Sequence, residues 1–473
     1  MELEKQVSRY SELTKFKWFI RVLLVSSVAC VLIAKIYLTI YVIDLTVGLY
    51  SILTSFVLLN ILVLSFFRYK DPYIEAQRID ISTDPPLVTI AVAVKNEEDN
   101  IRNCVQSCLN QTYQNKEIII VNDGSTDKTS ETLDDMRKEN ISKSLRIIHL
   151  SKSVGKKRAI EVASEVSNGE IYAFMDSDCD MAPDALEIAV KIFKADRRLG
   201  ALTAHGRVER ANNGTIIEKC QDVYIDVAFR AVKGAESSFN SVTCCSGSLS
   251  FYRRNAIQDF IHEWAHDKFL GQDFKFCTDR RMTAHVLESL AVSKNEDSAH
   301  IPIFQTGSDD IEIMKKSTDP DVHKESKHYW NVKYSHSIRV NVGVPTTILG
   351  LVKQQIRWKK SFIRSIFSTG GMFWKRPFYV ALLYYIQTAM KFVRPFVLFY
   401  VLVMLPLRGD LTSMLFWFAG IMYTGMVYGV EFRLRNPGSK RWIFRLLFAF
   451  LTTFVYTWLL IYAALTIRNR SWR

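Results

Sequence analysis

Two pairs of long apolar runs flank a charged central region, and this arrangement constrains the fold more than any other feature of the chain. Residues 18–40 and 46–67 precede the charged region, and residues 378–405 and 411–431 follow it. Each run approaches or exceeds the roughly 20 residues that a helix needs to cross a bilayer. The chain is therefore expected to be a multi-pass membrane protein with a polar domain between its spans.

The basic residues indicate on which side of the membrane the polar domain lies. Lys15 and Lys17 precede the first run, Arg68 and Lys70 follow the second, and the turn around Asp44 has no Lys or Arg. Positively charged flanks stay on the cytoplasmic side. We therefore expect a plasma-membrane protein with a cytoplasmic polar domain. The formal net charge of +13 follows this distribution, so we expect no nucleic-acid partner.

The last apolar run, residues 442–467, gives two conflicting signals. Hydropathy alone makes it a fifth span, but the basic tail with Arg468, Arg470 and Arg473 would then lie outside the cell. We therefore predict four full spans and a cytoplasmic C-terminus, with this run interfacial or re-entrant. Residues 345–369 mix basic and apolar faces, which predicts a helix on the membrane surface.

The central region shows the pattern of an α/β domain. Three β-branched runs, LVTIAVAVK (87–95), KEIIIVND (116–123) and EIYAFMDSDCD (170–180), are each followed by polar turn residues and a helical stretch. Such repetition predicts a mostly parallel sheet with ligands at the carboxyl ends of its strands. The predicted parts are two N-terminal transmembrane helices (1–75), the cytoplasmic domain (85–340), amphipathic interfacial helices (345–372) and C-terminal transmembrane and interfacial helices (377–473).

The cysteines do not suggest a disulfide framework or a metal site. The eight cysteines form no CxxC pair and no Cys/His metal spacing, and seven lie between Cys104 and Cys277. In a cytoplasmic domain they are expected to be reduced thiols.

Acidic residues end two of the predicted strands. Asp176 and Asp178, one residue apart, can hold a hard divalent cation and leave positions open for diphosphate oxygens. Asp123, before Gly124, can accept hydrogen bonds from a ribose or a base. For each motif taken alone, a solvated acidic turn or an ordinary Asp-Gly turn explains the residues equally well or better.

Three further motifs carry polar groups that suit a sugar nucleotide. Lys156 in VGKKRA offers a cation for phosphate, or simply begins a solvated helix. Asp279 in CTDRRMT is either a salt-bridged aspartate or a general base. In QQIRW, Gln354 can bind sugar hydroxyls, Arg357 can clamp phosphate and Trp358 can stack on a sugar face. A membrane-interface belt explains the Trp and Arg equally well.

The order of these motifs resembles that of the processive family 2 glycosyltransferases, which include hyaluronan, chitin and cellulose synthases. The segment CCSGSLSFYRR (244–254) is most similar to the CSGPLSxYRR segment of hyaluronan synthases, with Ser248 in place of the proline. The resemblance covers about residues 85–370. It implies a GT-A type nucleotide-sugar-binding domain, flanked by transmembrane and interfacial helices, that uses UDP-sugar donors and Mg²⁺ or Mn²⁺.

The resemblance also implies roles for individual residues. Asp123 and Glu97 would bind the uridine, Lys156 and Arg357 the diphosphate, and Asp176 and Asp178 the metal, with Asp176 also close to the nucleotide sugar. Asp279 would be the base that deprotonates the acceptor hydroxyl. The acceptor sugar would lie against Gln354, Trp358 and the pocket segment Cys245, Ser246, Gly247, Ser248 and Leu249.

Three departures from the family pattern bear on nucleotide contacts and gating. Asn122 replaces the first aspartate of the usual DDG. Cys277 and Thr278 precede Asp279 where hyaluronan synthases have Gly and an acidic residue. The family's gating motif reads WGTR, whereas this chain ends at Trp472–Arg473.

The expected activity is an inverting transfer that gives a β-linked polysaccharide, which enters the bilayer as it grows. Hyaluronan from UDP-GlcNAc and UDP-GlcA is the expected product, and a chitin-type or other synthase using a single UDP-sugar is the alternative. The other possible functions are a non-processive transferase that acts on a lipid and a transporter with a nucleotide-binding domain. Because four spans are few for a polymer channel, interfacial helices or a second protomer in a homodimer would have to complete it.

Overall fold

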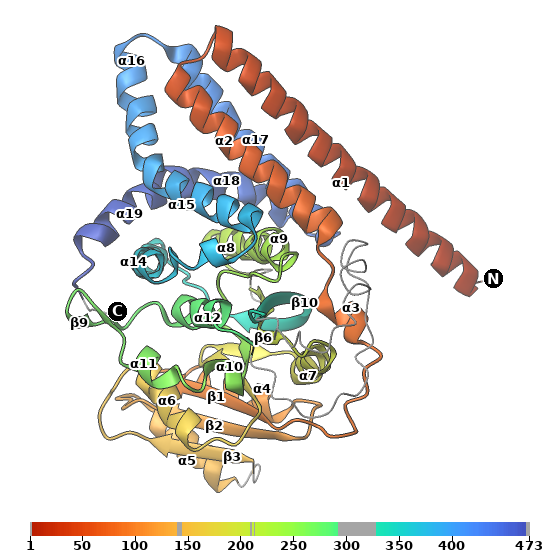
Figure 1. The fold of residues 1–473 in the computed structure, drawn as a ribbon, viewed down its shortest axis with the longest axis vertical. Coiled ribbons are helices and arrows are strands. Elements are labelled where there is room, and N and C mark those ends of the chain that lie inside the picture. The colour runs from red at the N-terminus through yellow and green to blue at the C-terminus, as the bar shows by residue number, and fades with distance from the viewer. Residues whose placement is uncertain (1, 140–143, 209–210, 212, 292–327, 470–473) are drawn as a thin grey trace, which may run out of the picture.

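The computed structural model describes residues 2–139, 144–208, 211, 213–291 and 328–469. Long helices form one end of the molecule and an α/β domain forms the other (Figure 1). The predicted tail residues Arg470, Trp472 and Arg473 lie outside the described residues.

An eight-stranded sheet forms the centre of the α/β domain, in the order β3-β2-β1-β4-β7-β6-β10-β5. Its β1–β2, β2–β3, β1–β4 and β6–β10 pairs are parallel, whereas β7 and β5 run antiparallel to their neighbours. The predicted mostly parallel α/β sheet is therefore confirmed. The strands are β1 (Val88–Val94), β2 (Lys116–Asn122), β3 (Leu145–His149), β4 (Ile171–Asp176), β5 (Cys179–Met181), β6 (Leu199–Arg207), β7 (Ser250–Arg253) and β10 (Asn331–Val342), with a separate hairpin of β8 (Lys268–Phe269) and β9 (Gln272–Asp273).

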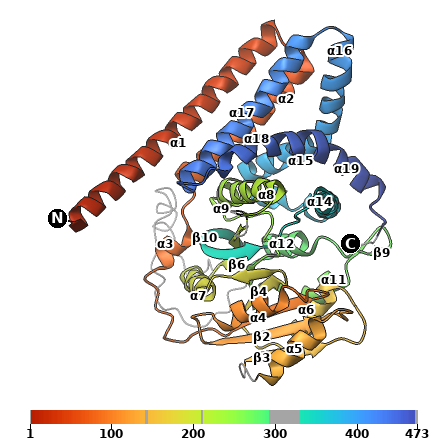
Figure 2. The same cartoon turned by 180° about the vertical axis from the view of Figure 1, so that it is seen from behind.

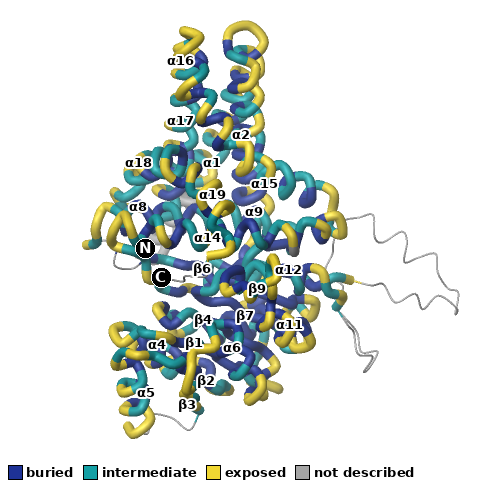
Figure 3. Tube along the Cα trace, turned by 90° about the vertical axis from the view of Figure 1, so that its left-hand side faces the viewer, coloured by how far each residue is buried: buried dark blue, intermediate teal, exposed yellow. Residues whose placement is uncertain are grey.

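Helices cover both faces of this sheet, which explains why its strands read as continuous apolar runs. Successive strand residues point to opposite faces: Ile90 packs in a core with α4 (Ile101–Leu109) and α7 (Ala185–Ala195). Its neighbour Ala91 packs in a second core with α6 (Lys156–Glu165) and α12 (Thr278–Glu288). Figure 3 shows the buried strands between these layers.

All eight cysteines are free thiols. Cys30 is exposed and Cys244 is half-buried, whereas the other six are buried. The buried thiols fill apolar volume in the cores, which is the usual place of a free cysteine.

Within the described residues, five helices are long and apolar enough to cross a membrane. Four of them, Lys15–Tyr41, Leu45–Ala76, Phe378–Leu407 and Leu411–Arg435, coincide with the predicted spans. Large side chains such as Phe396 and Leu407 are more than 70% exposed on them, which an apolar solvent would cover. The helices in these segments include α1 (Glu2–Tyr41), α2 (Leu45–Val63), α15 (Phe378–Phe399) and α17 (Leu411–Arg435).

The two turns that join these spans meet at the end of the bundle far from the sheet (Figures 1 and 2). Asp44 caps α2 by accepting hydrogen bonds from the amides of Thr46 and Val47. Its own amide donates to Ser413 Oγ at 2.8 Å, and its Oδ2 accepts from Tyr400 Oη at 2.7 Å. The two helical hairpins are therefore fastened to each other at this end.

The fifth apolar helix, Arg441–Leu465, differs in direction from the others. It consists of α18 (Phe444–Phe450), a π-helical turn and α19 (Tyr456–Leu465). In Figures 1 and 2 it runs across α2 and α17. It packs against α8 (Ile216–Val227) and α14 (Ile348–Thr369), which cover the α/β domain. Its length and composition suit a span, and its direction suits an interface, so the four-span topology stays a prediction.

Candidate functional site

The carboxyl end of β4 carries two carboxylates that suit a hard divalent cation. Asp176 ends β4 and Asp178 lies in the turn before β5. Ligand atoms of Asp176, Asp178 and Cys179 lie within 4.8 Å of one another. The Cys179 thiol is buried and directed to Asp178 Oδ1 at 3.4 Å, whereas the Asp178 carboxylate is exposed. Accessible oxygen donors of this kind fit Mg²⁺ or Mn²⁺.

Lys156 lies beside these carboxylates at the first position of α6. Its ammonium forms an ion pair with Asp176. Burial lowers the pKa of Lys156, but the carboxylates of Asp176, Asp279 and Asp178 more than offset this effect and raise its pKa above the ordinary value. The lysine therefore stays protonated and is placed to contact an anionic group that binds at the carboxylate pair.

Asp178 has a shifted pKa although its side chain is exposed. Partial desolvation in this concave part of the domain, followed by repulsion from Asp176, raises the pKa of Asp178 to about 6. Glu97 contributes to the same repulsion from the loop after β1, where it accepts a hydrogen bond from Asn100 Nδ2 at 3.0 Å. The predicted residues Glu97, Asp176 and Asp178 are thus gathered at one edge of the sheet.

Gly247 brings Asp176 and Asp279 together. Its carbonyl accepts a hydrogen bond from the Asp176 amide at 2.9 Å, and its amide donates to Asp279 Oδ2 at 3.0 Å. A Cβ atom at this position would lie 3.0 Å from Asp176 Oδ2 and 3.0 Å from Asp279 Oδ1. The lack of a side chain at Gly247 therefore allows a candidate metal ligand and a candidate base to share one site.

Two threonines hold the backbone around Gly247. Thr283 Oγ1 accepts a hydrogen bond from the Cys245 amide at 2.9 Å, and Thr203 Oγ1 accepts one from the Ser246 amide at 3.1 Å. Cys245, Ser248 and Leu249 are buried, so only part of the predicted acceptor segment faces open space. The sequence analysis missed both threonines, although Thr283 lies one helical turn after Asp279.

Asp279 is held at the start of α12. Cys277 precedes this helix in the left-handed region, with φ of 62°. Thr278 Oγ1 donates to Asp279 Oδ1 at 2.6 Å, so that both carboxylate oxygens of Asp279 accept a hydrogen bond. The departure at Cys277 and Thr278 therefore supplies a turn and a hydroxyl that orient Asp279.

Gly247→Ala is expected to reduce turnover at this site by at least about a hundredfold, because a misplacement of about 1 Å can cost that much. The added Cβ must displace the carboxylate of Asp176 or Asp279. The turnover of the purified protein measures the effect. Gly371→Ala is the control, since a Cβ there meets nothing within 4 Å. Wild-type turnover of Gly247→Ala would contradict the shared site.

Asp123 lies after β2 as predicted, but its carboxylate is occupied by the protein. It accepts hydrogen bonds from Ser153 Oγ at 2.8 Å and from the amides of Val154 and Gly155 at 2.6 and 3.0 Å. Asn122, the departure from DDG, accepts from the Ser125 amide at 3.1 Å. In this structure Asp123 therefore orders the loop that leads into Lys156, and Asn122 orders the turn that follows β2.

Lys157, the neighbour of Lys156 in the basic motif, has a structural role. Its ammonium and the Arg364 guanidinium both bind Asp267, at 3.1 and 2.6 Å, and all three side chains are largely buried. Arg364 belongs to α14, so this cluster fastens the helix that carries QQIRW to α6. Lys157 is therefore unavailable to phosphate.

The QQIRW residues lie on α14 with different exposures. Gln354 and Gln355 are buried, and Gln354 Oε1 and Gln355 Nε2 have no hydrogen-bond partner among the described residues. Arg357 is half-buried and Trp358 is 42% exposed. One turn further along the helix, Ser361 hydrogen-bonds the Cys277 thiol. α14 is therefore docked on the segment that positions Asp279, with buried amide groups available for a polar ligand.

A cavity of about 420 Å³ lies among the apolar helices. It is lined from α1, α2, α8, α15, α17 and α18. Its charged lining residues are cations, and no Asp or Glu lines it among the described residues. A smaller pocket beside Arg280, the neighbour of Asp279, shares Gln387 and Lys391 with this cavity. The cationic lining residues are Lys35, Lys391, Arg394 and Arg445.

Comparison with known proteins agrees with this geometry. Residues 89–261 match the family described as Glycosyl transferase family 2. The chain is 25% identical over 459 residues to a hyaluronan synthase of Streptococcus pyogenes, covering 96% of this chain and 97% of that protein. It is 24% identical over 309 residues to a poly-beta-1,6-N-acetyl-D-glucosamine synthase of Staphylococcus aureus, covering 64% and 62% of the two chains.

A solved structure shares the fold. The mannosyltransferase PcManGT from Pyrobaculum calidifontis, in complex with GDP-Man and Mn²⁺, aligns with a TM-score of 0.51 at 16% sequence identity. The alignment covers 89% of this chain and 99% of that one. The α/β domain with its flanking helices therefore has the GT-A type of fold that the sequence predicts.

Proposed function

We propose that this membrane protein transfers sugars from UDP-sugar donors to a growing polysaccharide, because residues 89–261 match the Glycosyl transferase family 2. The observation that carries the proposal is the contact of Gly247 with both Asp176 and Asp279. The candidate metal ligand Asp176 and the candidate base Asp279 therefore lie on either side of Gly247. Donor and acceptor can therefore meet there.

The mechanism follows from what these side chains can do. Asp279 takes a proton from the acceptor hydroxyl, whose oxygen attacks the anomeric carbon while the bond to the UDP oxygen breaks on the opposite face. A single displacement inverts the configuration and gives a β-linkage. Mg²⁺ or Mn²⁺ held by Asp176 and Asp178 would supply Lewis-acid stabilisation of the diphosphate charge. Lys156 adds a fixed positive charge to the same group.

The remaining predicted residues are assigned to binding. Glu97 and Asp123 contact the uridine, Asp123 by way of the loop it orders, and Arg357 holds the diphosphate with Lys156. The acceptor sugar lies against Gln354, Trp358 and the segment from Cys245 to Leu249. The unpartnered, buried Gln354 Oε1 supports this assignment, because a sugar hydroxyl would satisfy it.

The cationic cavity supports an anionic product. Ionisable side chains among membrane helices are costly and usually mark the path of a ligand. Arg394 donates to Thr453 Oγ1 at 2.6 Å and Lys35 donates to Ser55 Oγ at 3.0 Å, so in the described part of the chain these cations contact hydroxyl groups. A polymer that contains uronic acid would neutralise them. We therefore propose hyaluronan, made from UDP-GlcNAc and UDP-GlcA, as the product.

The cavity also bears on how the product leaves. The smaller pocket beside Arg280, the neighbour of Asp279, shares the lining residues Gln387 and Lys391 with the cavity, and would offer the product a route toward it. Arg445 and Thr453, from the last apolar run, complete the lining within one chain. This arrangement supports processive extrusion by a single protomer, with no homodimer needed to close the path.

A synthase that uses UDP-GlcNAc alone is the second candidate, supported by the similarity to a poly-beta-1,6-N-acetyl-D-glucosamine synthase. The two candidates differ in donor requirement. UDP release by the purified protein should be sustained only when UDP-GlcNAc and UDP-GlcA are both present. Equal release from UDP-GlcNAc alone would favour the second candidate, and no release from either donor would contradict the proposed function.

Trp358→Ala is expected to reduce polymer extension about tenfold, which corresponds to about 1.4 kcal/mol of lost acceptor contact. UDP-sugar hydrolysis should change less, because the indole contacts the acceptor and not the donor. Trp374→Ala is the matched control, since Trp374 is also exposed and packs on Tyr385 beside α15. Equal effects of both variants on both assays would assign Trp358 to a membrane belt.

A cysteine added after Arg473 tests the topology. In a Cys30→Ser background, which removes the one exposed native thiol, this cysteine should resist an impermeant thiol reagent in intact cells and react after permeabilisation. The expectation rests on the basic tail that includes Arg468. Labelling in intact cells would mean that residues 442–467 cross the membrane.

A further inference from the structure

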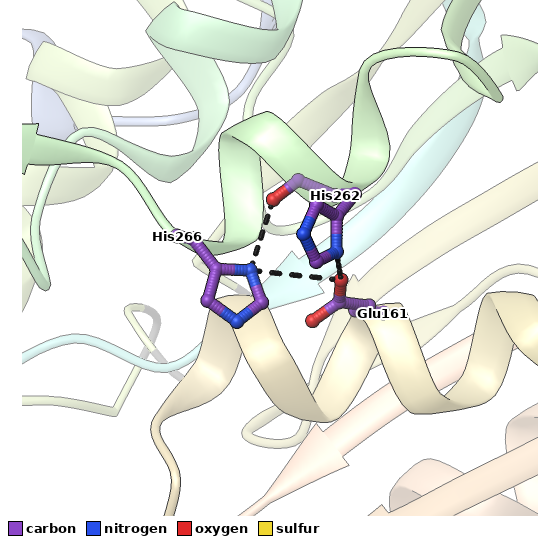
Figure 4. Close-up of side chains that lie close together, drawn as sticks. All are labelled: Glu161, His262 and His266. Carbon is purple, nitrogen blue, oxygen red and sulfur yellow. Dashed lines mark hydrogen bonds and ion pairs between the residues drawn. The ribbon is translucent and has the colours of Figure 1, made fainter.

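A histidine–carboxylate cluster lies on the α/β domain away from the Asp176–Asp279 site. Glu161 on α6 faces His262 and His266, which lie at and just after α11 (Ile261–Ala265) (Figure 4). His262 Nδ1 is 2.7 Å and His266 Nδ1 is 3.7 Å from Glu161 Oε1. One ligand atom of each residue lies within 4.8 Å of the others.

The environment of Glu161 sets this cluster apart from an ordinary surface ion pair. Glu161 is 8% exposed, whereas the His262 side chain is 82% exposed. Among the ion pairs of the described residues, Glu161 pairs with these two rings and with no Lys or Arg. A carboxylate that is largely removed from water needs a positive partner. A metal ion would supply it together with the two imidazoles.

We propose that Glu161, His262 and His266 bind a Zn²⁺ ion. Tetrahedral Zn²⁺ with bonds of about 2.0–2.1 Å to nitrogen and oxygen separates its ligand atoms by about 3.3 Å. The distances of 2.7 and 3.7 Å lie on either side of this value. The open side at His262 leaves the fourth position to water. Two imidazoles and one carboxylate favour Zn²⁺ over Mg²⁺.

Metal binding requires the same change at both imidazoles. His262 Nδ1, which hydrogen-bonds Glu161 Oε1 at 2.7 Å, must pass its proton to Nε2 before it can bind the ion, and so must His266 Nδ1. His266 Nδ1 also lies 3.0 Å from the His262 carbonyl oxygen. When this nitrogen binds the ion, its proton moves to Nε2 and the bond to the carbonyl is lost. The His266 side chain is 40% exposed, so water can accept a hydrogen bond from the Nε2–H group.

The spacing His262-Glu263-Trp264-Ala265-His266 has the H-E-x-x-H form found in metalloproteases. In those sites the Glu acts as a base beside the metal. Here Glu263 Oε1 instead accepts from Arg281 Nη2 at 2.8 Å, and Trp264 is buried with its Nε1 bonded to the Thr278 carbonyl at 2.9 Å. The arrangement therefore suits a metal that fixes structure, and the third ligand is Glu161.

The ion would connect two parts of the transferase site. Glu161 lies on the helix that begins with Lys156, and His266 directly precedes Asp267, which binds Lys157 and Arg364. A Zn²⁺ ion bound by Glu161 of α6 and by the two histidines at and after α11 would thus help to hold Asp267 in place against Arg364 of α14. This consequence concerns stability and position, and it involves no step of the sugar transfer.

Metal content of the full-length protein tests the site. The chain is purified in detergent with an affinity tag that contains no histidine, stripped with a chelator, and titrated with Zn²⁺ in excess Mg²⁺, which competes for all-oxygen sites. One tightly bound Zn²⁺ per chain is expected. His262→Asn and Glu161→Gln should weaken it by more than about 10- to 100-fold, the loss that follows removal of even an outer-shell partner.

Glu263→Gln is the matched control, because Glu263 lies within the same spacing but pairs with Arg281. It should retain Zn²⁺. The exposed His262 can be replaced without disturbing the fold, so a loss of metal in that variant is not a loss of structure. Wild-type Zn²⁺ affinity in His262→Asn, or loss of Zn²⁺ in Glu263→Gln, would overturn the proposal. Zn²⁺ titration uses no sugar nucleotide, so failure of the proposed transferase function leaves this result unchanged.

Discussion

Asp279→Asn is expected to lower sugar transfer by about 10²–10⁴-fold, the usual contribution of a general base. UDP binding, measured by calorimetry, should be unchanged. The amide oxygen of the asparagine can still accept the hydrogen bond that the Gly247 amide gives to Asp279 at 3.0 Å. The variant therefore removes the base and keeps the backbone of the acceptor segment in place.

Asp259→Asn is the control for this experiment, because Asp259 is an exposed carboxylate in the turn just before α11. Its turnover should match that of the wild type. If Asp279→Asn weakened UDP binding as much as it slowed transfer, Asp279 would have a structural role at the start of α12, and another residue would have to act as base.

Asp178→Asn is expected to lower the rates of both sugar transfer and UDP-sugar hydrolysis by at least about a hundredfold. The Lewis-acid stabilisation of the diphosphate is worth several kcal/mol, and each loss of about 1.4 kcal/mol lowers the rate tenfold. Both reactions break the same bond to UDP, so both should fail together. This separates Asp178 from Trp358, whose loss affects extension more than hydrolysis.

Asp180→Asn provides the matched carboxylate two residues away, where Asp180 Oδ2 accepts from Asn341 Nδ2 at 2.7 Å. This variant should retain most activity. Removal of divalent cations with EDTA should reproduce the Asp178→Asn defect in the wild type, and added Mg²⁺ or Mn²⁺ should reverse it. Full activity in EDTA would contradict the metal assignment.

The parts of the fold that the sequence predicts are those set by local pattern. The apolar runs at residues 18–40 and 411–431 form helices of spanning length, and the β-branched run at 87–95 contains β1. The antiparallel strand β7 was not predicted, since its place between β4 and β6 depends on contacts with distant residues. Likewise, hydropathy does not fix the direction of Arg441–Leu465, which is determined by packing on α8 and α14.

In the candidate site, too, local motifs predict individual residues, whereas the contacts between them depend on tertiary packing. The sequence identifies Asp176 and Asp279, because each lies in a short motif. It does not show that Gly247 brings them together, since this depends on how a segment between β6 and α12 crosses the end of β4. Nor does it show that the Asp123 carboxylate turns toward Gly155. Side-chain direction in loops is set by tertiary packing.

The same limitation applies to the basic and histidine motifs. Lys156 and Lys157 are adjacent and chemically alike, yet one faces Asp176 and the other is buried with Asp267. The His262–His266 spacing alone does not indicate a metal site, because the third proposed ligand, Glu161, lies about a hundred residues earlier in the chain.

Product analysis tests the central claim most directly. The purified protein is incubated in detergent with Mg²⁺ and radiolabelled UDP-GlcNAc, with or without UDP-GlcA, and the labelled material is sized and then treated with hyaluronidase or chitinase. We predict a labelled polymer of high molecular mass only when both donors are present, degraded by hyaluronidase and resistant to chitinase. A polymer made from UDP-GlcNAc alone, or label confined to a lipid, would contradict the account.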